Sequence, residues 1–316
     1  MEHEAYFHQP VLLKEVIDFL SPEPGENFVD ATLGGGGYSW QILDRVESSG
    51  NVLSIDCDLD AIKFAENQKS KIKNQNWILV HGNFRDIDKI VKHHRFGNIS
   101  GIVADLGLSS YELDQSGRGF SFQKKEILDM RFDLSQKTDA RFILESSGIK
   151  ELTKIFREFG EEKFAAQIAR GIQRVKDKGL RIKDTQDLYQ IIELALPKPV
   201  RYKAKDSARR IFQALRIAVN HELENLQEFL PKAFNLLNAN GRLAVVSFHS
   251  LEDRIVKQYF SKLTKGCVCP PDFPQCLCGR SPQGKLLTKR PVVASEEEIK
   301  LNSRAKAAKL RAIVKL

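Results

Sequence analysis

Four consecutive glycines, Gly34 to Gly37, constrain this chain more than any other feature of its sequence. They follow the apolar run Phe28–Leu33, which predicts a buried strand, and a helix-like stretch begins at Ser39. Glycines at such a corner let the backbone turn sharply and approach a ligand closely, and free N–H groups at a helix start favour a carboxylate or phosphate. The corner indicates a nucleotide-like ligand, but proteins that bind NAD, FAD or S-adenosylmethionine all have a glycine-rich turn of this kind. A strand-to-helix turn without a ligand is the alternative.

The same strand-then-helix pattern recurs through the first 108 residues. Strand starts are about 25 residues apart, which is the length of a βα unit with short loops. About 130 residues separate the fourth apolar run from the fifth, too many for one crossover, so we expect an inserted subdomain of helical periodicity. The sequence therefore predicts an α/β fold, a Rossmann-like doubly wound sheet with an inserted helical domain. The predicted strands are Phe28–Leu33, Val52–Ile55, Ile78–Val80, Gly101–Leu106 and Arg242–Phe248, and the predicted helices are Pro10–Leu20, Ser39–Val46, Asp60–Ile72, Asp86–His94, Ile149–Phe159, Lys163–Val175, Thr185–Ala195, Ala208–Phe229 and a basic helix over Ser295–Leu316.

Charge is distributed unevenly over the three predicted segments. Residues 1–112 and 219–316 form the two parts of the core, and residues 113–218 form the insert. The first part carries 10 Lys and Arg against 17 Asp and Glu, the insert 23 against 15, and the last part 16 against 9. An acidic first third followed by a basic remainder favours a polyanionic partner for the later residues. The alternative is an ordinary lysine-rich surface.

Composition disfavours several classes of protein. No apolar run approaches the roughly 18 residues of a membrane span, and the acidic start, without a small-residue cleavage site, argues against a secretory signal. We therefore expect a cytoplasmic protein with reduced cysteines and no membrane partner. Four cysteines cluster in two CxC pairs that could form a zinc site; a reduced surface loop is the alternative, and no metal ligand is assigned. They are Cys267, Cys269, Cys276 and Cys278.

Two acids narrow the ligand of the glycine corner. Asp56 ends the second predicted strand, where a carboxylate can accept both hydroxyls of an adenosine ribose. Asp30, in the first strand, suits the ammonium of a methionine moiety but would be unfavourable beside a pyrophosphate. No Gly-Lys-Ser/Thr follows the turn, so a phosphate-gripping loop is not indicated. These features favour S-adenosylmethionine, with Phe84 placed to stack near its adenine and Asp105 at the carboxyl edge of the fourth strand.

Several longer motifs extend from residue 8 to about residue 257. The longest is Ser247–Lys257, which contains Phe-His-Ser-Leu-Glu-Asp-Arg. The others are His8–Leu13 with Glu15, Asp30–Gly34 with Gly36 and Gly37, Asp105–Gly107 with Ser109 and Ser110, Arg118–Phe122, Leu128–Arg131, Gly160–Glu162 and Phe212–Ile217. Together they resemble the bacterial 16S ribosomal RNA cytosine-N4 methyltransferase family, RsmH or MraW.

The resemblance implies a fold, an activity and a cofactor site. It implies a class I S-adenosylmethionine methyltransferase fold that methylates the exocyclic N4 of the P-site cytidine, position 1402 in the usual numbering. The implied partner is 16S rRNA or the small ribosomal subunit, not DNA or a membrane, and a homodimer is left open. The family usually has histidine at Tyr38 and glutamine at Glu112; both replacements can accept a hydrogen bond, and Glu112 adds a negative charge. The implied cofactor contacts are Gly36, Gly37, Tyr38, Asp56, Phe84, Asp105 and Glu112.

The available side chains limit the reaction at the target base. Methylation at a pyrimidine C5 needs a cysteine nucleophile, and Cys57 lies beside the ribose acid, on the cofactor side. Direct attack by an exocyclic nitrogen or a hydroxyl is therefore favoured. An acceptor must then orient the amino group. Asp105 is the assigned catalytic candidate, and Asp129, Arg131 and His249 are alternatives.

Two basic features suit an RNA partner. The segment Ser116–Phe122 mixes arginine, glycine and aromatic residues, as grips for single-stranded RNA do, although a flexible loop is the alternative. Arg209, Arg210 and Arg216, at helical spacing, are the expected phosphate contacts. Two other functions compete. An NAD-dependent oxidoreductase does not account for Asp30 or the basic insert, and a non-catalytic ribosome-binding protein is favoured by net charge alone.

Overall fold

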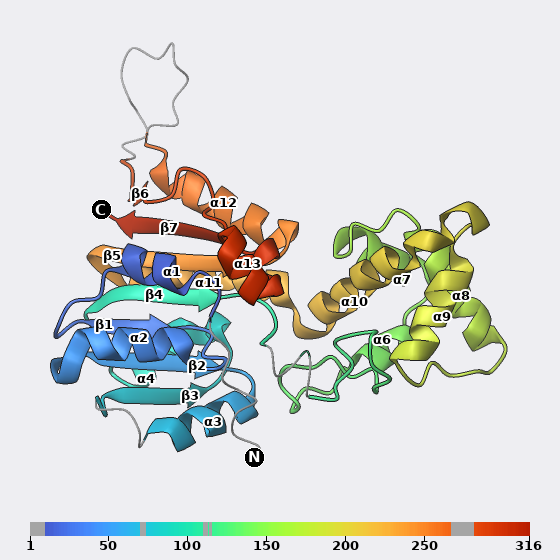
Figure 1. The fold of residues 1–316 in the computed structure, drawn as a ribbon, viewed down its shortest axis with the longest axis horizontal. Helices are drawn as coiled ribbons and strands as arrows, with labels where there is room; N and C mark the ends of the chain where they lie inside the picture. Colours follow the sequence, from blue (N-terminus) through green and yellow to red (C-terminus); the bar gives the residue numbers. More distant parts are fainter. Residues whose placement is uncertain (1–9, 70–73, 110–112, 114–115, 267–280) are drawn as a thin grey trace, which may run out of the picture. The chain divides into compact units, whose positions relative to one another are not determined.

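The chain divides into two compact units. The structure, a computed structural model, describes residues 10–69, 74–109, 113, 116–266 and 281–316. Residues 1–107 and 223–316 form the first unit, called the sheet unit here, and residues 108–222 form the second, called the helical unit. The helical unit is therefore inserted into the chain of the sheet unit (Figure 1).

A seven-stranded mixed sheet organises the sheet unit, with strand order β3-β2-β1-β4-β5-β7-β6. The first five strands pair in parallel, and β7 is antiparallel to both β5 and β6. Because β1, β2, β4 and β5 lie inside the sheet, their central residues are mostly buried and largely apolar, as in parallel strands covered on both faces. The strands are β1 (Asn27–Asp30), β2 (Asn51–Asp56), β3 (Trp77–His81), β4 (Ile99–Asp105), β5 (Leu237–Ser247), β6 (Gly284–Leu286) and β7 (Lys309–Lys315).

Helices cover both faces of this sheet (Figure 1). One hydrophobic cluster joins the strands to α4, α11 and α12, and another joins them to α1, α2 and α3. The doubly wound arrangement that the sequence predicts is confirmed. The helices are α1 (Leu13–Leu20), α2 (Gly37–Val46), α3 (Leu59–Lys69), α4 (Ile87–His93), α11 (Glu222–Leu236), α12 (Ser250–Thr264) and α13 (Glu296–Leu301), with 3-10 turns η1 (Glu47–Ser49), η2 (Phe84–Asp86) and η4 (Ser303–Ala307).

The helical unit has its own hydrophobic core. Apolar residues at three- and four-residue spacing, such as Leu152 and Phe156 in α7, face inward and are fully buried. Its helices are α6 (Ala140–Ser146), α7 (Ile149–Glu158), α8 (Ala165–Asp177), α9 (Thr185–Ala195) and α10 (Ala204–Asn220), with the 3-10 segment η3 (Lys198–Lys203) before α10.

Two predicted helices differ from the structure. The helix predicted over Ala208–Phe229 is interrupted because His221 takes a left-handed φ of 52° and ends α10. The basic helix predicted over Ser295–Leu316 exists only at its start, where the Ser295 hydroxyl caps α13. After it come the 3-10 turn η4 and then β7, which pairs with β5 on one side and β6 on the other.

Candidate active site at the carboxyl edge of the sheet

A glycine corner joins β1 to α2. Gly34 and Gly36 have φ values of 49° and 78°, which strain residues with side chains. At Gly37, where α2 begins, an added Cβ would overlap the ring of Pro10. The turn is thus as tight as the glycine run predicts, and the first turn of α2 presents N–H groups that have no partner within the helix.

Asp30, at the end of β1, supports this corner from inside the protein. Its side chain is fully buried and accepts hydrogen bonds from the Ser39 hydroxyl (2.6 Å) and the Thr32 N–H (3.2 Å). The Ser39 hydroxyl also lies 2.7 Å from that of Ser54. Burial raises the pKa of Asp30 to about 7. These internal hydrogen bonds show that Asp30 positions α2. That Asp30 also faces the ammonium of a ligand stays a prediction.

Asp56, at the end of β2, is joined directly to the glycine corner. Its Oδ2 accepts the Gly34 N–H at 2.8 Å, and its Oδ1 accepts the Asp58 N–H at 2.8 Å. Burial raises the pKa of Asp56 to about 6, although both backbone donors lower it. A carboxylate has about four acceptor sites, so Asp56 keeps capacity for the two hydroxyls of a ribose.

Asp105, at the end of β4, holds a buried acceptor that has no partner. Its backbone N–H donates to the Thr32 hydroxyl at 2.6 Å, which fixes the start of the loop after β4. Within the described part of the chain, its Oδ1 makes no hydrogen bond and is out of contact with solvent. Burial, and then the charges of Asp30 and Glu252, raise the pKa of Asp105 well above its usual range. Buried polar atoms are rarely left unpaired, so this oxygen indicates a ligand that brings a donor or a positive charge.

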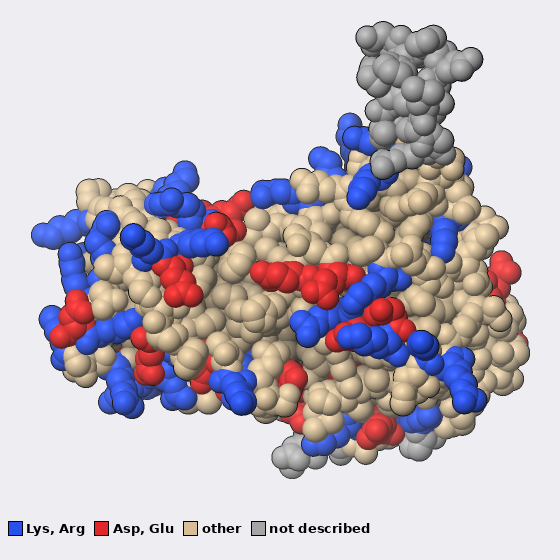
Figure 2. Space-filling view, turned by 180° about the vertical axis from the view of Figure 1, so that it is seen from behind, with Lys and Arg blue, Asp and Glu red and all other residues tan. Residues whose placement is uncertain are grey.

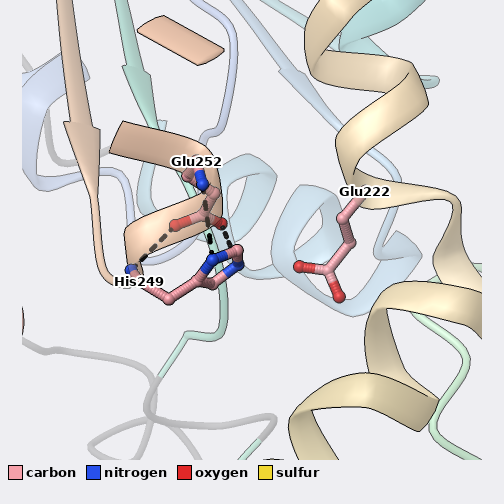
Figure 3. A group of neighbouring side chains, drawn as sticks. All are labelled: Glu222, His249 and Glu252. Atoms are coloured by element: carbon pink, nitrogen blue, oxygen red, sulfur yellow. Dashed lines mark hydrogen bonds and ion pairs between the residues drawn. The ribbon is translucent and has the colours of Figure 1, made fainter. Parts of the chain in front are cut away.

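The turn after β5 lies beside this loop, because the Leu106 N–H donates to the Val246 carbonyl at 2.9 Å. Figure 3 shows how His249 and Glu252 close the turn. Glu252 Oε2 accepts the N–H groups of Phe248 (2.9 Å) and His249 (3.2 Å), while His249 Nδ1 accepts the Glu252 N–H at 3.4 Å. This reciprocal capping box begins α12. His249 therefore has a structural role as the N-cap, with both of its ring nitrogens directed at Glu252.

Three of these acids share one electrostatic property. The pKa values of Asp30, Asp56 and Asp105 are all raised, with burial as the largest cause in each case. Negative charge gathered in a poorly solvated site is stabilised by a nearby cation. S-adenosylmethionine carries a sulfonium and an ammonium, so its charge fits this edge of the sheet, whereas a pyrophosphate would be repelled.

The remaining predicted cofactor positions differ in what they offer. The Tyr38 hydroxyl donates to the Val11 carbonyl, and its ring is buried. Phe84 lies in η2 and packs edge-on against Phe229, with ring centroids 5.1 Å apart. Glu112 lies outside the described residues. Tyr38 can thus contribute mainly through its backbone at the start of α2, and Phe84 through the part of its ring that stays exposed.

Sequence reasoning missed the groups that hold the site residues in place. Thr32 accepts from Asp105, and Glu252 holds the turn after β5. The signal for Glu252 was present as an acid three residues after a helix start, the spacing of a capping box. The capping box was not recognised in the sequence because histidine is not a preferred N-cap residue.

The predicted RNA grip at Ser116–Phe122 is an internal structure of the helical unit. Arg118 is only 7% exposed, donates to the carbonyls of Arg131 and Phe132, and lies over the Phe120 ring. Arg131 in turn forms a two-bond ion pair with Asp129, each bond 2.7 Å long. Asp129 and Arg131 are bonded to each other within the helical unit, so the structure does not support either of them as a catalytic group.

Two of the three expected phosphate contacts are also paired within the protein. Arg210 donates to Glu162 at 2.7 Å, and Arg216 forms two bonds of 2.8 Å with Glu222. Arg209 remains exposed, with a 3.4 Å ion pair to an exposed aspartate. Helical spacing alone did not reveal the carboxylates, because they come from other segments of the chain.

The topology and the site together define a class. Five parallel strands are extended by an antiparallel β7 between β5 and β6, with a glycine corner after β1 and an acid at the end of β2. This is the fold of a class I S-adenosylmethionine-dependent methyltransferase. None of the described helices is long and apolar enough to cross a membrane.

Comparison with known proteins identifies the family. The model of the MraW methylase family matches residues 5–316. Proteins named ribosomal RNA small subunit methyltransferase H are 44% identical in Clostridium botulinum, over 98% of this chain and 99% of that protein, and 44% identical in Heliobacterium modesticaldum, over 99% of each. A Clostridium thermocellum crystal structure described as a putative rRNA methylase matches with a TM-score of 0.45 and 11% identity, over 98% of this chain and 100% of that one, a likeness too distant to bear on function. The chain belongs to the MraW methylase family, and S-adenosylmethionine is its methyl donor.

Proposed function

We propose that this methyltransferase modifies the exocyclic N4 of the P-site cytidine in 16S rRNA of the small ribosomal subunit. The family and the names of its relatives support ribosomal RNA as the substrate. The observation that carries the site assignment is the unpartnered Oδ1 of Asp105 at the carboxyl edge of β4. A hydrogen-bond acceptor at this place suits an amino group as the nucleophile.

Each of the cofactor residues is assigned to one part of S-adenosylmethionine. We assign the ribose hydroxyls to Asp56, which has free acceptor sites beside the glycine corner. The start of α2, from Gly36 to Tyr38, suits the methionine carboxylate because its N–H groups and dipole favour negative charge. Phe84, Asp105 and Glu112 complete the proposed contacts.

Asp105 has two linked roles in this proposal. When bound, S-adenosylmethionine supplies an electrophilic methyl group next to a positive charge. That charge lowers the pKa of Asp105 from its raised value, so the carboxyl becomes an acceptor when the donor is present. The carboxylate then accepts a hydrogen bond from the target amino group, orients its lone pair and takes the proton that the amino group loses.

Covalent methylation at C5 is the second candidate, and the described residues do not favour it. The one cysteine among the described residues is Cys57, which follows Asp56 at the end of β2. This places its thiol on the side proposed for the ribose. Cys267, Cys269, Cys276 and Cys278 lie outside the described residues.

Transfer of a labelled methyl group to unmodified small-subunit particles tests the proposal. Nucleoside analysis should show N4-methylated cytidine, and Asp105→Asn should lower kcat about 100-fold or more because an amide cannot take the proton. Asp60→Asn, at an exposed position in the first turn of α3, is the charge-matched control. Product at C5, or no methylated cytidine from the wild-type enzyme, would refute the assignment.

A further inference from the structure

The segment that joins α9 to α10 carries an unusually exposed aromatic ring. Tyr202, in η3, is 77% exposed, which is more than any other aromatic side chain among the described residues. A tyrosine gains little from such exposure, since burial of its ring would be favourable by a few kcal/mol. A ring held in water on a folded unit is therefore a candidate contact for another molecule.

The backbone that carries this ring is anchored on both sides. Arg201 donates to the carbonyls of Leu196 (3.3 Å) and Leu194 (3.4 Å), so η3 is tied to the end of α9. On the other side, Ala204 is buried and anchors the first turn of α10. Tyr202 thus stands between two fixed helices, and binding through it would cost little conformational entropy.

Positive charge surrounds the ring. Lys198, Lys203 and Lys205 are exposed, and none forms an ion pair with the part of the chain that the structure describes. The Lys203 Nζ lies 5.3 Å from the centre of the Tyr202 ring. Arg209 follows one turn later, with only its exposed partner Asp206. In the space-filling view, Lys and Arg side chains are spread over the helical unit, at the left of Figure 2.

We propose that Tyr202, with Lys198, Lys203 and Lys205, forms a contact surface for single-stranded RNA. An unpaired base stacks on the tyrosine ring while the lysines neutralise neighbouring phosphates, which is how sequence-tolerant surfaces bind single strands. The positive charge disfavours a basic partner, and several exposed cations around one exposed ring favour a polyanion that also carries flat bases. The inference rests on the proposed RNA substrate and gives that substrate a second attachment point, outside the sheet unit.

Binding of a labelled single-stranded RNA, with the sequence around the target cytidine, tests this surface. Tyr202→Ala should weaken binding about 5- to 150-fold, the range for one stacked base, and Tyr202→Trp should restore it. Lys203→Gln with Lys205→Gln should lower the salt dependence, log Kd against log salt, by about 1.4, since each phosphate contact on a single strand contributes about 0.7.

Matched substitutions elsewhere in the helical unit serve as controls. Phe142→Ala removes another exposed aromatic ring (55% exposed), and Lys150→Gln with Lys154→Gln removes the same charge from the exposed face of α7. Both should leave the RNA affinity and its salt dependence close to wild type. If these controls weaken binding as much as the Tyr202 and lysine variants do, the effect is general charge or stability and the assigned surface is wrong.

Kinetics separate this inference from the proposed function. In methyl transfer to small-subunit particles, Tyr202→Ala should raise KM for the particle and leave kcat and S-adenosylmethionine affinity unchanged. A wild-type enzyme that methylates N4 while the variants keep wild-type KM and RNA affinity would overturn the surface alone. A wild-type enzyme that makes no methylated cytidine would overturn the proposed function. Loss of binding to anionic lipid vesicles, with RNA affinity intact, would assign Tyr202 to a membrane surface and also overturn the inference.

Discussion

The Oδ2 of Asp56 accepts the N–H of Gly34 at 2.8 Å, so the acid at the end of β2 is bonded to the first glycine after β1. Two segments that are distant in sequence are thereby held in one arrangement before any ligand arrives. The bond orients the carboxylate and fixes the turn at the same time. Binding of the cofactor should therefore require little reorganisation at this corner.

Replacement of Asp56 by asparagine should weaken S-adenosylmethionine binding about 10- to 150-fold. The amide keeps one acceptor oxygen but loses the charge, and hydrogen bonds to charged groups contribute about 1.5–3 kcal/mol each. Isothermal titration calorimetry measures the change. Asp60→Asn, at an exposed position in the first turn of α3, is the control and should bind normally. Equal affinities for wild type and Asp56→Asn would show that the ribose is held elsewhere.

Binding of S-adenosylmethionine should strengthen as pH rises from about 5 to about 8. Without ligand, the pKa of Asp56 is raised to about 6 and that of Asp30 to about 7, so both carboxyls are partly protonated over this range. The cation favours the ionised forms, and binding releases protons. Calorimetry in buffers of different ionisation enthalpy counts those protons. A pH-independent affinity, with no proton release in the wild-type enzyme, would contradict the cation-centred site.

Asp30 should make the ligand-free protein less stable near pH 7 than near pH 5. Its folded pKa, about 7, exceeds the unfolded value of 3.8, so the folded state binds more protons between these values. The free energy of unfolding therefore falls as pH rises through this window and then levels off. In urea denaturation, Asp30→Asn should show a smaller fall than wild type between about pH 5 and pH 7. Parallel pH curves for the two proteins would be incompatible with a raised pKa at Asp30.

Replacement of His249 by asparagine should leave kcat within about threefold of wild type. Asparagine is a preferred N-cap residue and can accept the Glu252 N–H that His249 accepts now. His249→Ala should lower the free energy of unfolding by about 1 kcal/mol, a typical loss for a missing cap. Thermal unfolding and the methyl-transfer rate together check both variants. A loss of 100-fold in kcat with Asn, at unchanged stability, would return His249 to the list of catalytic candidates.

Local sequence patterns were sufficient for most of the fold. The five parallel strands follow from apolar runs bounded by turns, and α9 was predicted with its observed limits, Thr185–Ala195. Its N-cap is Asp184, whose side chain accepts the N–H groups of Gln186 and Asp187. That Lys309–Lys315 form a strand could not be predicted from the local sequence, because the pairing with β5 and β6 decides the conformation of this segment.

The site was predictable where chemistry follows from position in a strand. Asp56 and Asp105 both end parallel strands, so their place at the carboxyl edge required only the α/β pattern. The sequence could not predict which charged side chains are bonded within the protein and which are available to a ligand. Arg210 is paired with Glu162 from another segment, and Asp30 accepts a hydrogen bond from Ser39 inside the same corner. These pairings depend on three-dimensional packing, which periodicity does not report.

The insertion of the helical unit between β4 and β5 also sets an order for folding during synthesis. β4 ends at Asp105, and β5, its hydrogen-bonded neighbour, begins at Leu237, so the ribosome must add the whole helical unit before the sheet can close. At roughly 5–20 residues per second, the 131 residues between Asp105 and Leu237 take about 7 to 26 seconds, and one edge of β4 is exposed during that time. The helical unit is continuous in sequence and has its own core, so it can fold during that interval. The nascent chain should therefore pass through a state in which the helical unit is native and the catalytic sheet is still open.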